Sequence, residues 1–456
     1  MQYSTFAAID IGSYDVILEI FEISKKQGIR SVDKICHRME LGKDTYTLGK
    51  IRPEMEEELC RVLADFVRIM EGYRVDAYRA MASSAISEAA NSLYVLGKIR
   101  QLTGLSVTVL SNSEQRFLGY KALAAMEDNF NKIIEKGTAI LDLDGGSFQI
   151  SLFDKDALVT TQNIRMGSLR IRERLAGIQS ETEHYEEMVE ELIWNEVSSF
   201  KKMYLKDRKI ENIMLIGDVF TDSVYQNIEE KTTKIISREN FNTWYEKIIR
   251  QSPMELAVKL GIPLENASLM YPSAVIYKCL IDMMGAEHIW IPGVHMTRGI
   301  AYEYAEQMKL LKGGHNFEND ILMAAKNIGK RYAVNRPHVQ NLEMTALAMF
   351  DATKKMHGMK ERERLLLQMA VMLHDVGKYI SFNNVADSSY NIIMSNEIIG
   401  LSHIEREMVA LIARYNTVTL PSYDELVMES SLSAEQYLTV SEPVSYTHLT
   451  LPTNSL

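Results

Sequence analysis

FAAIDIGSYDVILEIF, residues 6–21, joins two apolar runs through an aspartate, a glycine and a serine. Short apolar runs that flank turn residues are typical of buried strands, so this stretch predicts a strand, a tight turn and a second strand. The pattern returns in AILDLDGGSFQISLF, residues 139–153, again with aspartate, glycine and serine between two apolar runs. Two such units in one chain indicate an internal duplication.

Helical and strand patterns alternate around these two units. Residues 53–72 begin with proline, end with glycine and carry apolar side chains near helical spacing, which predicts an amphipathic helix. Residues 106–110 and 213–216 have the composition of buried strands, and the alternation of helix and strand predicts an α/β fold. After a linker at residues 312–316, helical patterns continue from Asp320 with almost no strand pattern, so an all-α domain is expected there.

The composition excludes several classes of protein. Of the 456 residues, 46% are hydrophobic and 24% are charged, as in globular proteins rather than disordered or fibrous ones. The net charge of -11 repels polyanions at long range, so we expect no specific nucleic-acid partner. No apolar run has the length of a membrane helix, and three widely spaced cysteines support neither a disulfide framework nor a zinc knuckle. We therefore expect a cytoplasmic protein with no membrane partner.

The paired turns are the strongest candidates for chemistry. Glycines allow a ligand to approach the backbone, a serine adds a hydroxyl donor, and an aspartate at a strand end can hold Mg²⁺ or a water beside a bound phosphate. The candidates are Asp10, Gly12 and Ser13 in the first turn, and Asp142, Gly145, Gly146 and Ser147 in the second. Two such turns facing each other would hold one phosphate chain. The alternative is that each is only a tight hairpin, for which glycine and aspartate are ordinary residues.

Four segments carry a resemblance to a known family: residues 8–13, 82–89, 141–147 and 166–170. In order and spacing they resemble the exopolyphosphatase and guanosine pentaphosphate phosphohydrolase (Ppx/GppA) family, whose fold is actin-like (ASKHA, ribonuclease H-like). The resemblance implies hydrolysis of the terminal phosphate of inorganic polyphosphate or guanosine pentaphosphate in a cleft between two lobes. It also implies Mg²⁺ or another divalent cation as cofactor, and a homodimer.

The resemblance further implies a division of the chain and roles for the turn residues. The lobes would be residues 1–125 and 126–312, followed by an α-helical HD-like domain at residues 318–440. Asp10 and Asp142 would hold the metal and position water, and the glycines and serines of both turns would hold phosphate. Residues 441–456 continue no helical pattern, so we expect a non-native or disordered tail there.

Four residues depart from the family's pattern: Tyr14, Ser87, Gln115 and Gln149. The family's proposed catalytic glutamate falls on Gln115, and an amide cannot take a proton from an attacking water. The neighbouring Glu114 is then the candidate base. The alternative function is a catalytically weakened protein of the same fold that binds polyphosphate or a nucleotide and regulates without turnover.

A third group of candidates lies in the helical part. His338, His374 and Asp375 match the opening ligands of an HD-type metal phosphohydrolase, because imidazole and carboxylate can share a divalent ion. The alternative is a capped helix end, since the apolar helical pattern before His374 stops near Gly377. If these residues carried the activity, it would survive mutation of Asp142 and fail with His374→Ala.

Overall fold

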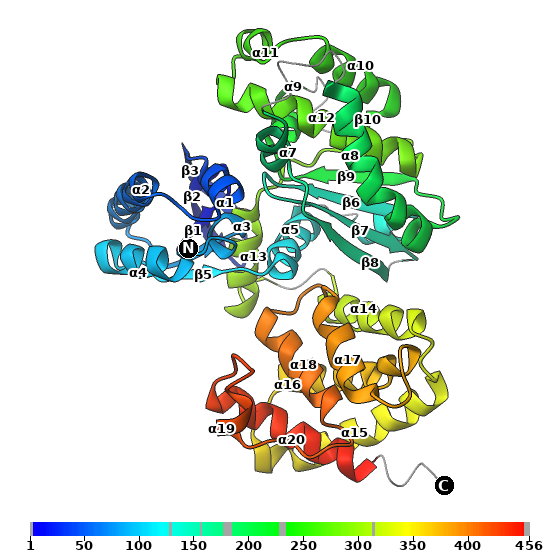
Figure 1. Cartoon of the computed structure of the whole chain (residues 1–456). Helices are drawn as coiled ribbons and strands as arrows, with labels where there is room; N and C mark the ends of the chain where they lie inside the picture. The colour runs from blue at the N-terminus through cyan, green and yellow to red at the C-terminus, as the bar shows by residue number, and fades with distance from the viewer. Residues whose placement is uncertain are drawn as a thin grey trace. The chain divides into compact units, whose positions relative to one another are not determined.

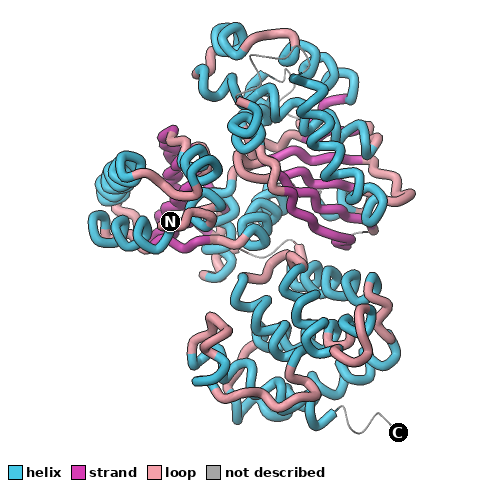
Figure 2. The backbone as a smooth tube through the Cα atoms, in the orientation of Figure 1, coloured by secondary structure: helices cyan, strands magenta, loops and turns pink. Residues whose placement is uncertain are grey.

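The computed structural model of the chain describes residues 3–126, 130–155, 157–176, 185–227, 234–311 and 315–450. They belong to two compact units, Met1–His315 and Asn316–Leu456. The first unit contains two sheets, whereas the described residues of the second contain helices and no strand (Figures 1 and 2). Within the described ranges, no helix combines the length and apolar character needed to cross a membrane.

The first sheet has five strands in the order β3-β2-β1-β4-β5. Their bounds are β1 Ser4–Ile11, β2 Asp15–Ser24, β3 Gly28–Arg38, β4 Ala77–Ala82 and β5 Val107–Val109. The strands β1, β2 and β3 form an antiparallel meander, and β4 and β5 continue the sheet in parallel with β1. The expected strand, turn and strand at residues 6–21 is therefore the β1-β2 hairpin.

The second sheet has six strands in the order β10-β11-β9-β6-β7-β8. Their bounds are β6 Thr138–Leu143, β7 Phe148–Asp154, β8 Ala157–Ile164, β9 Asn212–Ile216, β10 Ile235–Ser237 and β11 His288–Trp290. As in the first sheet, β6, β7 and β8 form an antiparallel meander, and β9 pairs with β6 in parallel. The shared order of meander and parallel neighbour confirms the duplication that the two turns predict.

Helices cover both faces of the first sheet. They are α1 Leu41–Leu48, α2 Pro53–Gly72, α3 Ser84–Ser87, α4 Ser92–Thr103, α5 Asn112–Met126 and α13 Met296–Gln307. Side chains alternate along β1, so Ile9 packs with the core that includes Phe66 of α2, while Phe6 packs with Ile300 of α13. The chain thus returns to the first sheet through α13, which the expected boundaries of 1–125 and 126–312 assigned to the second lobe.

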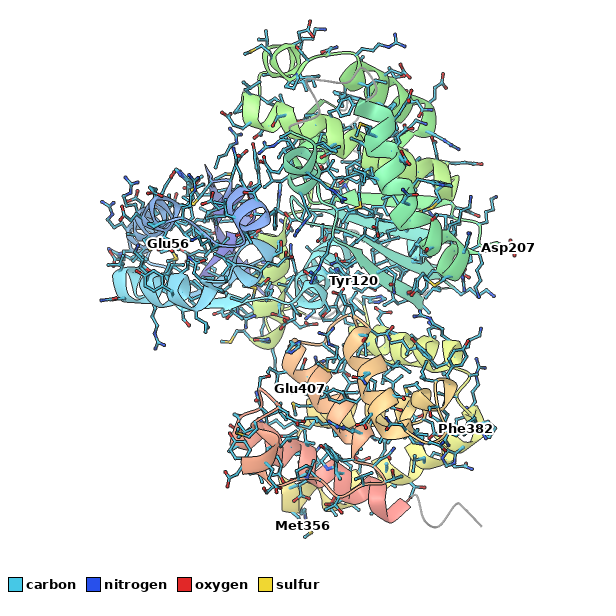
Figure 3. All side chains as sticks on the ribbon, in the orientation of Figure 1. Glu56, Tyr120, Asp207, Met356, Phe382 and Glu407 are labelled. Carbon is cyan, nitrogen blue, oxygen red and sulfur yellow. The ribbon has the colours of Figure 1, made fainter. Side chains whose placement is uncertain are left out.

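The second sheet has a separate core and its own helices. These are α6 Phe130–Ile134, α7 Ser168–Leu175, α8 Tyr185–Phe200, the π-helix Lys201–Leu205, α9 Val219–Asn227, α10 Arg238–Ile249, α11 Pro253–Leu260 and α12 Leu264–Met284. An aromatic cluster joins α5 to this lobe: Tyr120 (Figure 3) lies 5.3 Å from Phe130 and 5.2 Å from Phe153, measured between ring centroids. The helix α5 is therefore fixed against both lobes, through α13 on one side and these rings on the other.

The second unit is a bundle of helices. They are α14 Phe317–Arg331, α15 Arg336–His357, α16 Glu361–Leu373, the 3-10 turn Val376–Tyr379, α17 Val385–Ser395, α18 His403–Arg414, α19 Tyr423–Leu426 and α20 Ala434–Thr450. Leu342 and Phe350 of α15 pack against Leu367 and Val371 of α16 in its core.

The helix α20 includes residues 441–450 of the expected non-native or disordered tail, so this part is helical rather than disordered, and a non-native origin stays a prediction. It continues to Thr450, and Val440 and Val444 are buried on its inner face. Two apolar side chains four residues apart hold this turn in a helix although the segment lacks charged pairs. Residues 451–456 lie outside the described residues.

Candidate active site

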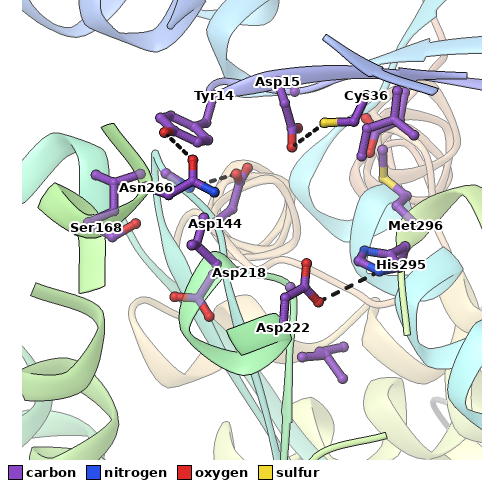
Figure 4. Close-up of a pocket in the computed structure, with 18 of the residues that line it drawn as sticks. Tyr14, Asp15, Cys36, Asp144, Ser168, Asp218, Asp222, Asn266, His295 and Met296 are labelled. Carbon is purple, nitrogen blue, oxygen red and sulfur yellow. Dashed lines mark hydrogen bonds and ion pairs between the residues drawn. The ribbon is translucent and has the colours of Figure 1, made fainter. Parts of the chain in front are cut away.

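A pocket of about 400 Å³ lies between the two lobes of the first unit (Figure 4). Both hairpins reach it: Asp10 and Gly12 from the first, and Asp142 and Gly145 from the second. The aspartates occupy equivalent register positions, since Asp10 pairs with Ile17 across β1-β2 and Asp142 with Gln149 across β6-β7. The duplication therefore brings one carboxylate from each unit into a single pocket.

Asp10 is half-buried near the end of β1, and its Oδ1 atom has no hydrogen-bond partner in the described structure. Burial raises the pKa of Asp10 well above its ordinary value, and the carboxylates of Asp15 and Asp144 raise it further. A buried oxygen without a donor is costly unless a cation or a ligand satisfies it. This atom is thus available to a positively charged ligand.

Asp142 lies near the end of β6 and is also half-buried. Burial and the neighbouring Asp144 raise the pKa of Asp142 to about 7, although Arg116 acts in the opposite direction. The backbone approaches this carboxylate closely at Gly217, whose φ of 103° suits glycine. A Cβ at Gly217 would lie only 2.5 Å from Asp142 Oδ1, so no side chain fits there.

Four further aspartates line the pocket: Asp15, Asp144, Asp218 and Asp222. Burial is the largest cause that raises the pKa values of Asp15 and Asp218, each to about 6. The cations that line the same pocket are Lys34 and Arg38, both from β3. Six carboxylates against two cationic side chains make the pocket electronegative, which suits divalent cations with oxygen ligands.

Sequence reasoning missed Asp218, Asp222 and His295. Asp218 follows Gly217 directly after the parallel strand β9, and an aspartate and glycine at such a strand end are the available signal. Asp222 Oδ1 lies 3.6 Å from His295 Nε2, although the two residues are far apart in the sequence (Figure 4). No local pattern predicts that pair.

The two glycine turns are locked together, so their residues have different roles. Ser13 Oγ donates a hydrogen bond to Asp144 Oδ1 at 3.0 Å, which links the first turn to the second. Gly12 and Gly145 line the pocket, whereas Ser13, Gly146 and Ser147 are not among its lining residues. These three residues shape the turns from outside the pocket lining, and their contact with phosphate stays a prediction.

Gly146 shows why the second turn needs glycine. A Cβ there would lie 2.2 Å from the Tyr46 hydroxyl and 2.7 Å from Ser84 Oγ. Tyr46 and Ser84 are themselves 2.8 Å apart and hydrogen-bonded. Close packing between the lobes, rather than contact with a ligand, thus accounts for this glycine.

The start of α7 adds a positive dipole end to the pocket. Ser168, its first residue, lines the pocket beside Gly145. The peptide dipoles of a helix favour anions near its first turn. This feature belongs to the segment 166–170 that the sequence singles out, although the sequence alone does not show that it faces the aspartates.

The structure separates the two candidates at the start of α5. Gln115 lines the pocket, and its Nε2 lies 3.4 Å from Asp144 Oδ2. Glu114 is not a lining residue, because its Oε2 accepts hydrogen bonds from the backbone N–H (2.9 Å) and the Oγ (2.7 Å) of Ser111. Glu114 caps α5, so this geometry does not favour it as the catalytic base.

The three candidates in the helical unit lie together. Donor atoms of His338, His374 and Asp375 are within 4.8 Å of one another. They belong to a different unit from the pocket.

Comparison with known proteins gives two family matches. Residues 20–308 match the model of the Ppx/GppA phosphatase family, and residues 322–440 match that of Ppx/GppA phosphatase, domain III. A protein named guanosine-5'-triphosphate,3'-diphosphate pyrophosphatase from Photobacterium profundum is 20% identical over 436 residues, which cover 94% of this chain and 83% of the relative. One of the same name from Vibrio atlanticus is 19% identical over 442 residues, covering 95% and 85%.

Solved structures support the fold of the first unit. A crystal structure of an exopolyphosphatase from Cytophaga hutchinsonii aligns with a TM-score of 0.60 and 16% identity, covering 68% of this chain and all of that one (100%). The Aquifex aeolicus member of the Ppx/GppA family aligns with a TM-score of 0.55 and 18% identity, covering 67% and 99%. The two lobes therefore have the actin-like fold of these proteins.

Proposed function

The chain belongs to the Ppx/GppA phosphatase family, and on this premise we propose that it releases the terminal phosphate of inorganic polyphosphate or of guanosine pentaphosphate. One observation carries the proposal: the duplicated hairpins bring Asp10 and Asp142 into one pocket beside the start of α7. Phosphoryl transfer needs positioning and charge neutralisation more than covalent chemistry. The paired carboxylates would hold a cation that neutralises charge, and the helix N-terminus would position the phosphate.

The pocket fits Mg²⁺ or another divalent cation. Among the described residues Asp10 Oδ1 is a buried oxygen with no donor, and burial together with neighbouring carboxylates raises the pKa of both Asp10 and Asp142. Oxygen ligands of this kind are those that Mg²⁺ prefers. When bound, the ion would neutralise charge on the phosphate oxygens. Asp10 and Asp142 are the residues that would hold it.

Side chains that line the pocket would bind the water and the phosphate chain. Gln115 lines the pocket as a hydrogen-bond donor and cannot accept the proton of an attacking water. Asp142 would hold the ion and orient the attacking water. Its pKa of about 7 belongs to the ion-free pocket, and a bound cation would lower that pKa. Lys34 and Arg38 would offset the charge of an incoming phosphate chain at the rim.

Two finer features belong to this proposal. The helical unit, which matches domain III of the family over residues 322–440, would be HD-like, and the protein would act as a cytoplasmic homodimer. Light scattering of the purified chain tests the dimer directly. A mass of one chain, 52.0 kDa, would contradict it.

The test is phosphate release from long-chain polyphosphate and from guanosine pentaphosphate with Mg²⁺. We expect Asp142→Asn to lose a factor of about 10² or more, because even residues that only support a metal ligand are worth about 10- to 100-fold. Asp282→Asn is the matched control, because Asp282 is an exposed partner of Arg238 and Lys278 outside the pocket. No release from either substrate, while polyphosphate still raises the melting temperature, would instead favour a binding protein.

A further inference from the structure

His338, His374 and Asp375 form a cluster in the helical unit. His338 lies in the first turn of α15, which Asn335 caps by accepting a hydrogen bond from the His338 backbone N–H. His374 and Asp375 follow α16 at its carboxyl end. The two imidazole rings are 5.6 Å apart between centroids, and one donor atom from each of the three residues lies within 4.8 Å of the others.

The protonation of His374 follows from its contacts. Its side chain is only 4% exposed, and Nδ1 lies 2.7 Å from the carbonyl oxygen of Val371. A carbonyl can only accept, so Nδ1 carries the proton and the neutral ring leaves a lone pair on Nε2.

The other nitrogen of His374 faces an acceptor. Nε2 is buried, has no hydrogen-bond partner in the described structure, and lies 3.4 Å from Asp375 Oδ1. A lone pair and a carboxylate oxygen repel each other unless a cation lies between them. A histidine whose Nδ1–H is fixed by a carbonyl while Nε2 faces a carboxylate is typical of a metal ligand with its supporting hydrogen bond.

We propose that His338, His374 and Asp375 bind a divalent transition-metal ion such as Zn²⁺ through two imidazole nitrogens and one carboxylate oxygen. Nitrogen ligands suit borderline ions such as Zn²⁺, whereas Mg²⁺ prefers oxygen. Three protein ligands leave a position for water or an anion, as in open zinc sites. His338 is half-buried, so the ion has a path from solvent.

Lys378, beside the cluster, binds only one of the two carboxylate oxygens of Asp375, so the other can bind the ion. Lys378 Nζ donates to Asp375 Oδ2 at 2.6 Å, so the lysine occupies one carboxylate oxygen and Oδ1 remains directed at His374. In this arrangement Lys378 orients the carboxylate. Without it, Asp375 could turn away from the imidazoles.

The experiment measures Zn²⁺ binding to the full chain without a histidine tag, stripped of metal and kept in excess Mg²⁺ to occupy oxygen-only sites. Isothermal titration should find a site in the wild type that is weakened about 10²-fold or more in His338→Ala and in His374→Asn, since even supporting residues of metal ligands are worth 10- to 100-fold. Asparagine keeps a donor for the Val371 carbonyl and removes Nε2. His403→Ala, at an exposed histidine of the same unit, and Asp142→Asn, in the pocket, should bind as the wild type does.

Co²⁺ gives a second readout, because its visible absorption bands report nitrogen coordination. The bands should appear in the wild type and disappear in both cluster variants. If His374→Asn does not fold, the half-buried His338→Ala carries the test, with circular dichroism confirming its fold. Wild-type affinity in His338→Ala, or no Zn²⁺ bound by the wild type above excess Mg²⁺, would overturn the proposal. Neither result depends on phosphate release.

Discussion

Asp142→Asn should stabilise the protein at pH 7 when divalent cations are absent. The folded state holds Asp142 where burial and Asp144 raise its pKa from the ordinary 3.8 to about 7. Between those values the folded state retains a proton that the unfolded state releases. The wild-type carboxyl therefore destabilises the fold increasingly as pH rises from about 4 to about 7, and an uncharged amide removes this penalty.

The magnitude follows from the pKa and the exposure. A pKa raised from 3.8 to about 7 corresponds to about 4 kcal/mol at pH 7 as an upper limit. Because Asp142 is half-buried and opens onto a pocket that admits water, screening reduces this to about 1–2 kcal/mol. Asp142 belongs to the unit Met1–His315, and in a folding unit of that size the change raises the melting temperature by roughly 1.5–3 °C.

The assay is thermal unfolding of the wild type and Asp142→Asn with a chelator at pH 5, 6, 7 and 8. The variant should melt higher at pH 7 and 8, and the difference should shrink by more than half at pH 5, where the wild-type carboxyl is protonated. Added Mg²⁺ should raise the melting temperature of the wild type more than that of the variant. A variant that is less stable than the wild type at every pH, or a difference independent of pH, would refute this reasoning.

Three other outcomes are expected. At low Mg²⁺ concentration, phosphate release should rise with pH up to about 7 as Asp142 loses the proton that competes with the cation, and high Mg²⁺ should move this rise to lower pH; a pH profile that does not depend on Mg²⁺ would exclude Asp142 as a ligand of the ion. Gln115→Glu should raise the rate about tenfold or more by adding a carboxylate at the pocket, and an unchanged rate would show that the amide does not limit catalysis. Gly146→Ala should lower stability by about 1–3 kcal/mol in chemical denaturation because its Cβ would clash with Tyr46, whereas Gly72→Ala, with no atom within 4 Å of a Cβ, should not be destabilising.

The local pattern predicts the core of the fold and both central aspartates. An apolar run, an aspartate and a glycine turn specify a hairpin through neighbouring residues alone, and repetition of the pattern implies two similar lobes. The structure confirms this at β1-β2 and β6-β7, with Asp10 and Asp142 in equivalent positions. The helix predicted at residues 53–72 is α2, Pro53–Gly72, for the same local reason.

Features that depend on contacts distant in the sequence were missed. The helix α13 returns to the first sheet because Ile300 packs with Phe6, which no local pattern reveals. Asp222 and His295 meet only after the second lobe has folded. Glu114 and Gln115 are adjacent, and which one faces the pocket depends on the rotation of α5 about its axis, which is set by the contacts of that helix with both lobes.

The measurement that tests the account most directly is the rate of phosphate release from polyphosphate with Mg²⁺ for wild type, Asp10→Asn and His374→Asn. Asp10 contributes the buried oxygen without a donor, so the account predicts that Asp10→Asn loses a factor of about 10² or more. His374→Asn, in the other unit, should retain the wild-type rate. If Asp10→Asn released phosphate at the wild-type rate, or if only His374→Asn lost phosphate release, the chemistry would lie outside the pocket and the account would be contradicted.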